Sequence, residues 1–166
     1  ALEGMRPALG GGGMVAQVDA RGYAVATGPQ GFEAGTPAIA AAVAWDEALR
    51  MLEEAGMEAI RRHVAALASR AQRELSAVPG VRVLGGTSPA SASLVSFTVD
   101  GVHPHDASAA LDAEGVLVRA GHHCAKPLHA ALGVRASVRA SFAGYSSDGD
   151  VEALLGAVER LVERGA

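Results

Sequence analysis

The residues best suited to chemistry lie together in the second half of the chain, around Cys124. It is the one cysteine among 166 residues; His122, His123 and Lys126 lie within two positions of it, and Arg119 lies five positions before it. Positively charged neighbours favour the thiolate, which is the nucleophilic form of cysteine. A lone cysteine is ordinarily a small buried hydrophobe, but such a residue is seldom surrounded by so many polar side chains. The pattern favours a reactive thiol.

The same region also has to be considered as a metal site. The candidate ligands are His103, His105, His122, His123, Cys124 and His129. Adjacent histidines point in different directions, and the sequence has no Cys-x-x-Cys or His-x-x-x-His pair of the kind that binds zinc. We therefore expect no metal.

Two other polar positions have both an ordinary and a functional interpretation. Arg139 lies in a predicted strand, where it could be a surface residue or a guanidinium that binds a carboxylate at two points. Gly35 and Thr36 precede a predicted helix, where they could form an ordinary cap with Pro37 in the first turn. Their backbone amides and hydroxyl could equally bind a phosphate. The residues alone leave the role of Arg139 open and favour an ordinary cap at Gly35 and Thr36.

Hydrophobic periodicity predicts the elements that must position these side chains. Residues 1–37 contain many glycines and predict loops with a short strand or two, whereas residues 38–79 predict two helices interrupted at Gly56. Beyond residue 80 the predicted strands are 81–84, 95–99, 116–118 and 138–142, and the predicted helices are 105–114 and 151–162. Short strands with helices on one side indicate a small α+β domain.

Composition excludes several classes of protein. The chain is 49% hydrophobic and 19% charged with a formal net charge of −4, which predicts a folded domain and argues against a general nucleic-acid binder. The sequence has no apolar run long enough to predict a membrane span. It also shows no secretory signal at its N-terminus. A single cysteine excludes an internal disulfide, and we expect an intracellular protein.

Taken together, the motifs resemble a known family. The run R-A-G-H-H-C-A-K-P at 119–127 resembles the cysteine loop of SufS-type cysteine desulfurases and selenocysteine lyases. These enzymes belong to the class V aminotransferase group of pyridoxal-phosphate enzymes, which have the α/β architecture called fold type I. The F-E-A-G-T-P segment at 32–37, the glycine run at 10–15 and the R-A-S strand at 139–141 also resemble the family, in the same order.

The resemblance implies a role for each candidate residue. Cys124 would attack the substrate sulfur and carry it as a persulfide. Arg139 would grip the substrate carboxylate, with Arg119 and His123 as neighbours in the substrate site. Gly35 and Thr36 would reach the cofactor phosphate of a partner subunit.

The resemblance also implies how the chain is organised. It corresponds to the C-terminal part of such an enzyme: residues 1–37 would end the large cofactor-binding domain, 38–79 would be connecting helices, and 80–166 would form the small α+β domain. The implied substrate is L-cysteine, or alternatively L-selenocysteine. The implied surroundings are a homodimer in the cytoplasm and a sulfur-acceptor protein, for example in iron–sulfur cluster assembly.

The sequence departs from the family at two points. The family's Schiff-base lysine lies upstream of the glycine run, whereas Lys126 is the one lysine of this chain and stands in the cysteine loop. We therefore expect no covalent attachment of pyridoxal phosphate and no activity of the isolated chain. A non-enzymatic sulfur-carrier module and a functionless remnant are the alternatives. Gly31 stands where relatives often have a basic residue, which is expected to weaken a local contact.

Overall fold

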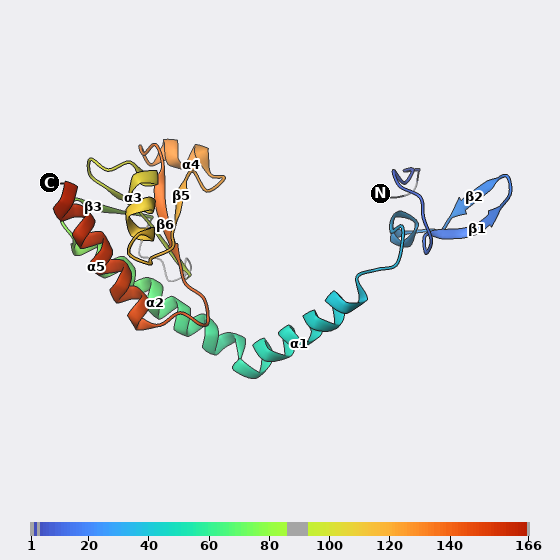
Figure 1. Cartoon of the computed structure of the whole chain (residues 1–166), viewed down its shortest axis with the longest axis horizontal. Coiled ribbons are helices and arrows are strands. Elements are labelled where there is room, and N and C mark those ends of the chain that lie inside the picture. The colour runs from blue at the N-terminus through green and yellow to red at the C-terminus, as the bar shows by residue number, and fades with distance from the viewer. Residues whose placement is uncertain (1, 3, 86–92, 166) are drawn as a thin grey trace. The chain divides into compact units, whose positions relative to one another are not determined.

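The structure, a computed structural model, describes residues 2, 4–85 and 93–165. It divides into two compact units, Ala1–Glu54 and Ala55–Ala166, drawn in blue to cyan and in green to red in Figure 1. The division lies within the predicted connecting segment 38–79. Parts of the predicted domains 1–37 and 80–166, namely residues 1, 3, 86–92 and 166, lie outside the described residues. None of the described helices has the length and apolar character needed to cross a bilayer.

The first unit begins with a small hairpin followed by loops, as predicted. Strand β1 (Val15–Asp19) pairs antiparallel with β2 (Gly22–Val25). The turn between them is closed by the Asp19 carboxylate, which accepts from the Arg21 amide at 2.7 Å and from the Gly22 amide at 3.1 Å. Such local side-chain bonds are the reason that aspartate favours turns.

Glycine is required at Gly31, where a resemblance to the family led us to expect a basic residue. Gly31 is buried in the short 3-10 helix η1 (Pro29–Phe32). A Cβ at this position would overlap the carbonyl oxygen of Ala26. The local backbone therefore leaves no room for a basic side chain at this position.

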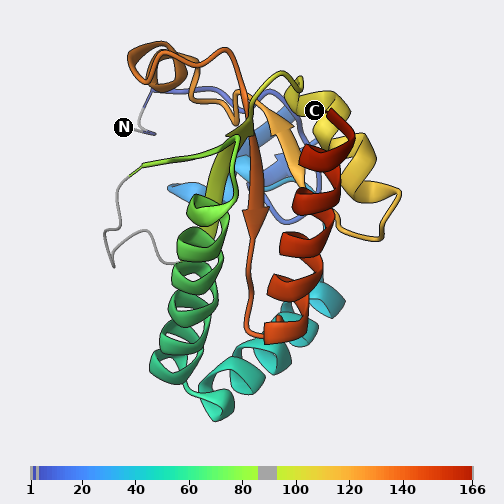
Figure 2. The same cartoon turned by 90° about the vertical axis from the view of Figure 1, so that its left-hand side faces the viewer.

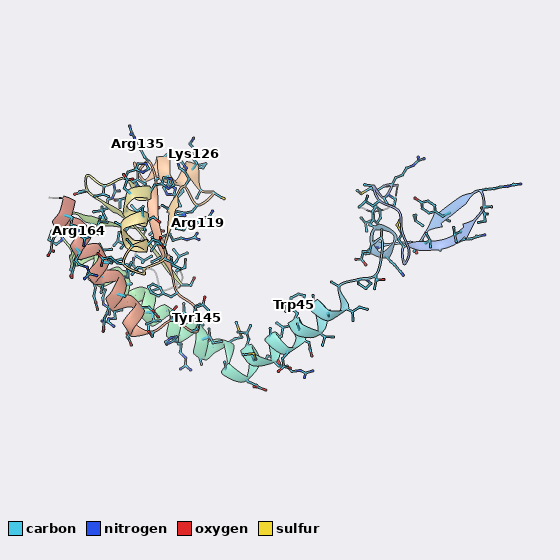
Figure 3. The ribbon with its side chains drawn as sticks, in the orientation of Figure 1. Trp45, Arg119, Lys126, Arg135, Tyr145 and Arg164 are labelled. Atoms are coloured by element: carbon cyan, nitrogen blue, oxygen red, sulfur yellow. The ribbon has the colours of Figure 1, made fainter. Side chains whose placement is uncertain are left out.

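Helix α1 (Ile39–Ala55) forms where it was predicted, but it buries no residue. Its apolar positions are exposed, including Trp45, which is 68% accessible and is labelled in Figure 3. The predicted helix is confirmed, and its apolar side chains are exposed in this chain.

The second unit is built on a four-stranded antiparallel sheet in the described residues. Its strands are β3 (Val81–Leu84), β4 (Leu94–Val99), β5 (Arg119–Gly121) and β6 (Ser137–Ser141). Their order in the sheet is β3-β4-β6-β5. The predicted small α+β domain is thereby confirmed, and of the mixed or antiparallel sheet expected for it the structure shows the antiparallel form.

Helices α2 (Met57–Ala77) and α5 (Asp148–Gly165) run side by side against this sheet (Figure 2). With α3 (Pro104–Asp112) they enclose a core whose fully buried members include Leu75, Phe97, Leu111 and Val158. Arg70 joins α2 to α5 through ion pairs to Asp148 at 2.8 Å and Glu152 at 3.2 Å. These carboxylates and Glu74 raise the pKa of Arg70.

Two predictions around the cysteine loop are wrong. The strand predicted at 116–118 is absent: Val116 and Val118 pack half-buried against the core, Leu117 is 81% exposed, and strand pairing begins at Arg119. Helix α4 (Lys126–Ala131) was not predicted. Pro127 in its first turn is well suited to a helix start, because proline has no amide hydrogen to leave unbonded there.

Candidate functional site

The site is organised by β6, whose side chains alternate between the two faces of the sheet. Val138 and Ala140 are buried in the core, and Arg139, which lies between them in the strand, is on the opposite face of the sheet. Arg139 pairs directly with Ser96 of β4 and with Arg119 of β5. Because directly paired residues in an antiparallel sheet point to the same side, the two guanidinium groups share one face.

This arginine pair has no balancing charge in the described part of the chain. Like charges directly opposite each other destabilise a sheet, and neither Arg119 nor Arg139 forms an ion pair with a described carboxylate. The Nε atom of Arg139 is buried and has no hydrogen-bond partner among the described residues. Buried donors in native proteins are almost always bonded, so this geometry is suited to an anion that accepts from Arg139.

The cysteine loop leaves β5 immediately after Gly121 and has a strained backbone. His123 and Cys124 both have positive φ, 50° and 58°. The left-handed conformation costs about 1–2 kcal/mol for a residue with a Cβ. The Ala125 amide donates to the His122 carbonyl at 2.8 Å, which closes a turn around the exposed Cys124. Such strained residues concentrate where the surrounding structure holds a functional group in place.

His123 is held by a backbone contact to β6. Its Nε2 donates to the carbonyl oxygen of Ser137 at 3.1 Å, so in the neutral ring Nδ1 carries no proton. Burial lowers the pKa of His123 below its usual value, the bond to Ser137 partly opposes this, and the charges of Arg139, His129 and Arg119 lower the pKa further. The ring is therefore neutral at pH 7, and its buried Nδ1 has no partner in the described residues. This nitrogen is free to accept a hydrogen bond or a proton.

His129 and Ser137 also belong to the site, and the sequence did not predict that they interact. His129 is 5% exposed and Ser137 is 1% exposed. His129 bonds the Ala125 carbonyl through Nδ1 and the Ser137 hydroxyl through Nε2, each at 3.0 Å. Had Pro127 been taken as a helix start, the spacing would have placed His129 one turn after Ala125. Nothing in the sequence indicates the pairing with Ser137.

The histidines lie close together without forming a metal centre. The ring of His129 is 5.8 Å from that of His122 and 5.9 Å from that of His123, centroid to centroid. Across the described ranges, no three histidine, cysteine or acidic side chains are arranged to hold a metal ion.

Gly35 and Thr36 belong to the first unit, whereas the cysteine loop and its arginines belong to the second. The Gly35 amide donates to the Gly12 carbonyl at 2.7 Å, so it is already bonded. Thr36 is exposed and precedes the first residue of α1, Ile39. Of the predicted site residues, the structure thus assembles Arg119, His123, Cys124 and Arg139 in one unit.

The described residues do not fit a covalent pyridoxal-phosphate site. Such a site needs a lysine that forms a Schiff base, and the one lysine of the chain, Lys126, is exposed at the start of α4. Arg119 and Lys126, which are labelled in Figure 3, lie on β5 and α4. The exposed Cys124 lies in the loop between these two elements. A buried amine is lacking from the part of the chain that the structure describes.

A family model matches most of the chain. The family model described as "Aminotransferase class-V" matches residues 1–154. The chain therefore belongs to the class-V aminotransferase family.

Within that family the chain is similar to cysteine desulfurases. It is 44% identical over 158 residues to a probable cysteine desulfurase of Halobacterium salinarum, covering 95% of this chain and 38% of the relative. The apo structure of a cysteine desulfurase from Thermococcus onnurineus matches 95% of this chain and 40% of its own length, at 40% identity and TM-score 0.84. The Escherichia coli cysteine desulfurase CsdA matches 98% of this chain and 40% of its own length, at 38% identity and TM-score 0.82. The chain thus spans about 40% of the length of these relatives.

Proposed function

We propose that this chain supplies the sulfur-accepting cysteine and the carboxylate-binding arginines of a cysteine desulfurase. The observation that carries the proposal is the buried, unbonded Nε of Arg139 opposite Arg119, on the strands next to the Cys124 loop. An amino acid substrate has a carboxylate that matches this site, and Cys124 is an exposed thiol on the adjoining loop. The similarity to cysteine desulfurases supports the choice of L-cysteine as the amino acid.

The proposed reaction moves one sulfur atom from carbon to Cys124. The thiolate of Cys124 and L-cysteine give a Cys124 persulfide and L-alanine. The Cβ–Sγ bond of the substrate breaks and an S–S bond forms. The electron pair stays on the carbon, which takes up the proton of the substrate thiol, and the persulfide is left as an anion. The substrate carbon is reduced and the sulfur is oxidised by the same two electrons, so no external oxidant or reductant is needed.

The residues around Cys124 have separate tasks in this reaction. Arg139 binds the substrate carboxylate with two parallel bonds, which fixes the orientation of the amino acid. Arg119 adds positive charge on the same face. The unprotonated Nδ1 of His123 can take the proton of a thiol.

We propose that the remaining components come from outside this chain. Pyridoxal phosphate would withdraw electrons from the substrate in the whole enzyme, on a lysine that this chain lacks. A homodimer in which Gly35 and Thr36 reach the partner's cofactor phosphate remains part of the proposal. So do cytoplasmic localisation, a sulfur-acceptor protein and a role in iron–sulfur cluster assembly.

The proposal is tested in a fusion protein that adds the part of a relative which this chain does not cover. This chain is fused behind the N-terminal part of the Halobacterium salinarum relative, and alanine formation from L-cysteine is measured with pyridoxal phosphate present. We expect activity in the fusion, an added sulfur atom on Cys124 by mass spectrometry, and loss of both in Cys124→Ser. Ser76→Ala, on the exposed surface of α2, is the matched control. Full activity of Cys124→Ser in the fusion would contradict the assignment.

The same fusion separates the alternatives. The exposed position of Lys126 favours a sulfur carrier that starts no chemistry itself. In that case the isolated chain accepts sulfur on Cys124 from an active donor enzyme, and the fusion forms no alanine. If Cys124→Ser loses cysteine desulfuration but keeps the release of selenide from L-selenocysteine, the selenocysteine lyase assignment is favoured.

A further inference from the structure

The feature that the proposed reaction does not use is the buried polar pair of His129 and Ser137. The carbonyl oxygen of Ala125 can only accept a hydrogen bond, so Nδ1 of His129 must carry a hydrogen. In the neutral ring Nε2 then accepts from the Ser137 hydroxyl. Burying polar groups is unfavourable unless they are bonded, and here the two side chains satisfy each other.

Ser137 holds the cysteine loop on both sides of the thiol. Its backbone carbonyl accepts from His123, the residue before Cys124. Its hydroxyl bonds His129, which in turn bonds the carbonyl of Ala125, the residue after Cys124. One residue of a rigid strand therefore fixes both neighbours of the exposed thiol.

This support is placed where the backbone is strained. His123 and Cys124 adopt left-handed conformations without being glycine, and such conformations persist only where surrounding contacts impose them. Rotation of Cys124 to an ordinary negative φ would redirect its Cβ. The position of the thiol relative to Lys126, two residues further along the loop, would then change.

We propose that His129 and Ser137 are positioning residues that hold the Cys124 loop in its left-handed conformation and so fix the direction of the thiol. The inference rests on the proposed function of Cys124 for its biological meaning. The geometry itself can be tested without any sulfur chemistry, so the two proposals can fail separately.

The first readout is amide hydrogen exchange in the 166-residue chain. The Ala125 amide is protected by its bond to His122, so its exchange reports opening of the loop. In Ser137→Ala and in His129→Leu we expect exchange at Ala125 to quicken at least tenfold relative to exchange at Phe97 in the core. Ser108→Ala is the matched control, because this part-buried serine also bonds a backbone carbonyl, that of Val118.

The second readout uses reagent charge. Because Cys124 is the one thiol of the chain, alkylation by iodoacetate and by iodoacetamide reports on it alone. The ratio of the two rates reflects the local charge and is independent of the thiolate fraction. We expect this ratio to change at least threefold in Ser137→Ala and His129→Leu, and to stay within 1.5-fold of the unmodified chain in Ser108→Ala.

A purely structural role predicts a different result. The variants would then melt at a lower temperature, while relative exchange at Ala125 and the alkylation ratio would match those of Ser108→Ala. That result, or a change smaller than stated in either readout, overturns the inference. Ser137→Ala removes only a hydroxyl, so it keeps the test valid if His129→Leu does not fold.

Discussion

Arg139 combines two properties that act against folding stability: its Nε is buried without a partner, and it faces Arg119 across the sheet. We therefore expect Arg139→Gln to raise the free energy of unfolding by about 0.5 kcal/mol, because a cross-strand like-charge pair is removed. The same change should abolish carboxylate binding. Urea unfolding followed by circular dichroism measures the first effect, and titration with L-alanine measures the second.

Arg135→Gln is the control for this prediction, since Arg135 is exposed and carries the same charge. If Arg139→Gln lowers the unfolding free energy by more than Arg135→Gln does, Arg139 supports the fold. The functional interpretation would then lose its main support.

His123 predicts a pH dependence of stability. Burial and the neighbouring positive charges lower its pKa in the folded chain below the usual value of 6.5, so the unfolded chain binds more protons at mildly acidic pH. Stability from this residue is therefore complete above pH 6.5. It is lost as the pH falls from 6.5 towards the lowered pKa.

The measurement is urea unfolding at pH 7.5, 6.5 and 5.5 for the chain and for His123→Gln, which keeps a donor for Ser137. We expect the variant to lose less stability between pH 7.5 and 5.5. Equal losses in both proteins would show that His123 has the same pKa in the folded and unfolded chains.

At the scale of elements, the burial of Leu111 and Leu117 can be compared, because Leu117 lies in the strand that was predicted at 116–118 and is absent. Leu111 on α3 is fully buried, whereas Leu117 is 81% exposed. Leu111→Ala should lower the unfolding free energy by about 2–5 kcal/mol through lost burial and a cavity. Leu117→Ala should change it by less than about 0.5 kcal/mol. Similar losses from the two variants in urea unfolding would mean that Leu117 is buried after all.

Sequence patterns located most helices and strands and failed near the site. The apolar run at 116–118 looks like a strand, but an apolar run alone does not fix strand pairing. The pairing is set by the register with β6, which places Ala120 beside Val138. Helix α4 was missed because six residues are too few for a hydrophobic period.

The candidate site shows the same limit. Cys124, His123, Arg119 and Arg139 were recognised because their residue types occur in a characteristic order. That Arg119 and Arg139 face each other depends on a long-range register, and Ser137 acts partly through its backbone carbonyl. Neither property belongs to a residue type, so the sequence alone does not disclose it.

At the scale of the whole molecule, the stability of the second unit should be independent of the first. The core cluster runs from Val64 to Val158 and lies entirely within residues 55–166. A chain of residues 55–166 should therefore unfold cooperatively at the temperature of the full chain. A chain of residues 73–166, which lacks Val64, Leu67 and other core positions of α2, should not fold. Calorimetry of the two fragments tests this, and loss of cooperative unfolding in residues 55–166 would refute it.

The two arginines that face each other on β5 and β6 should also couple carboxylate binding to thermal stability. A bound carboxylate screens the repulsion between Arg119 and Arg139 and gives the buried Nε an acceptor. By mass action, any ligand that binds only the folded chain stabilises it in proportion to the logarithm of its concentration. We therefore expect small carboxylates that bind this pair to raise the melting temperature, and a scan of such carboxylates would rank candidate substrates before any turnover is measured.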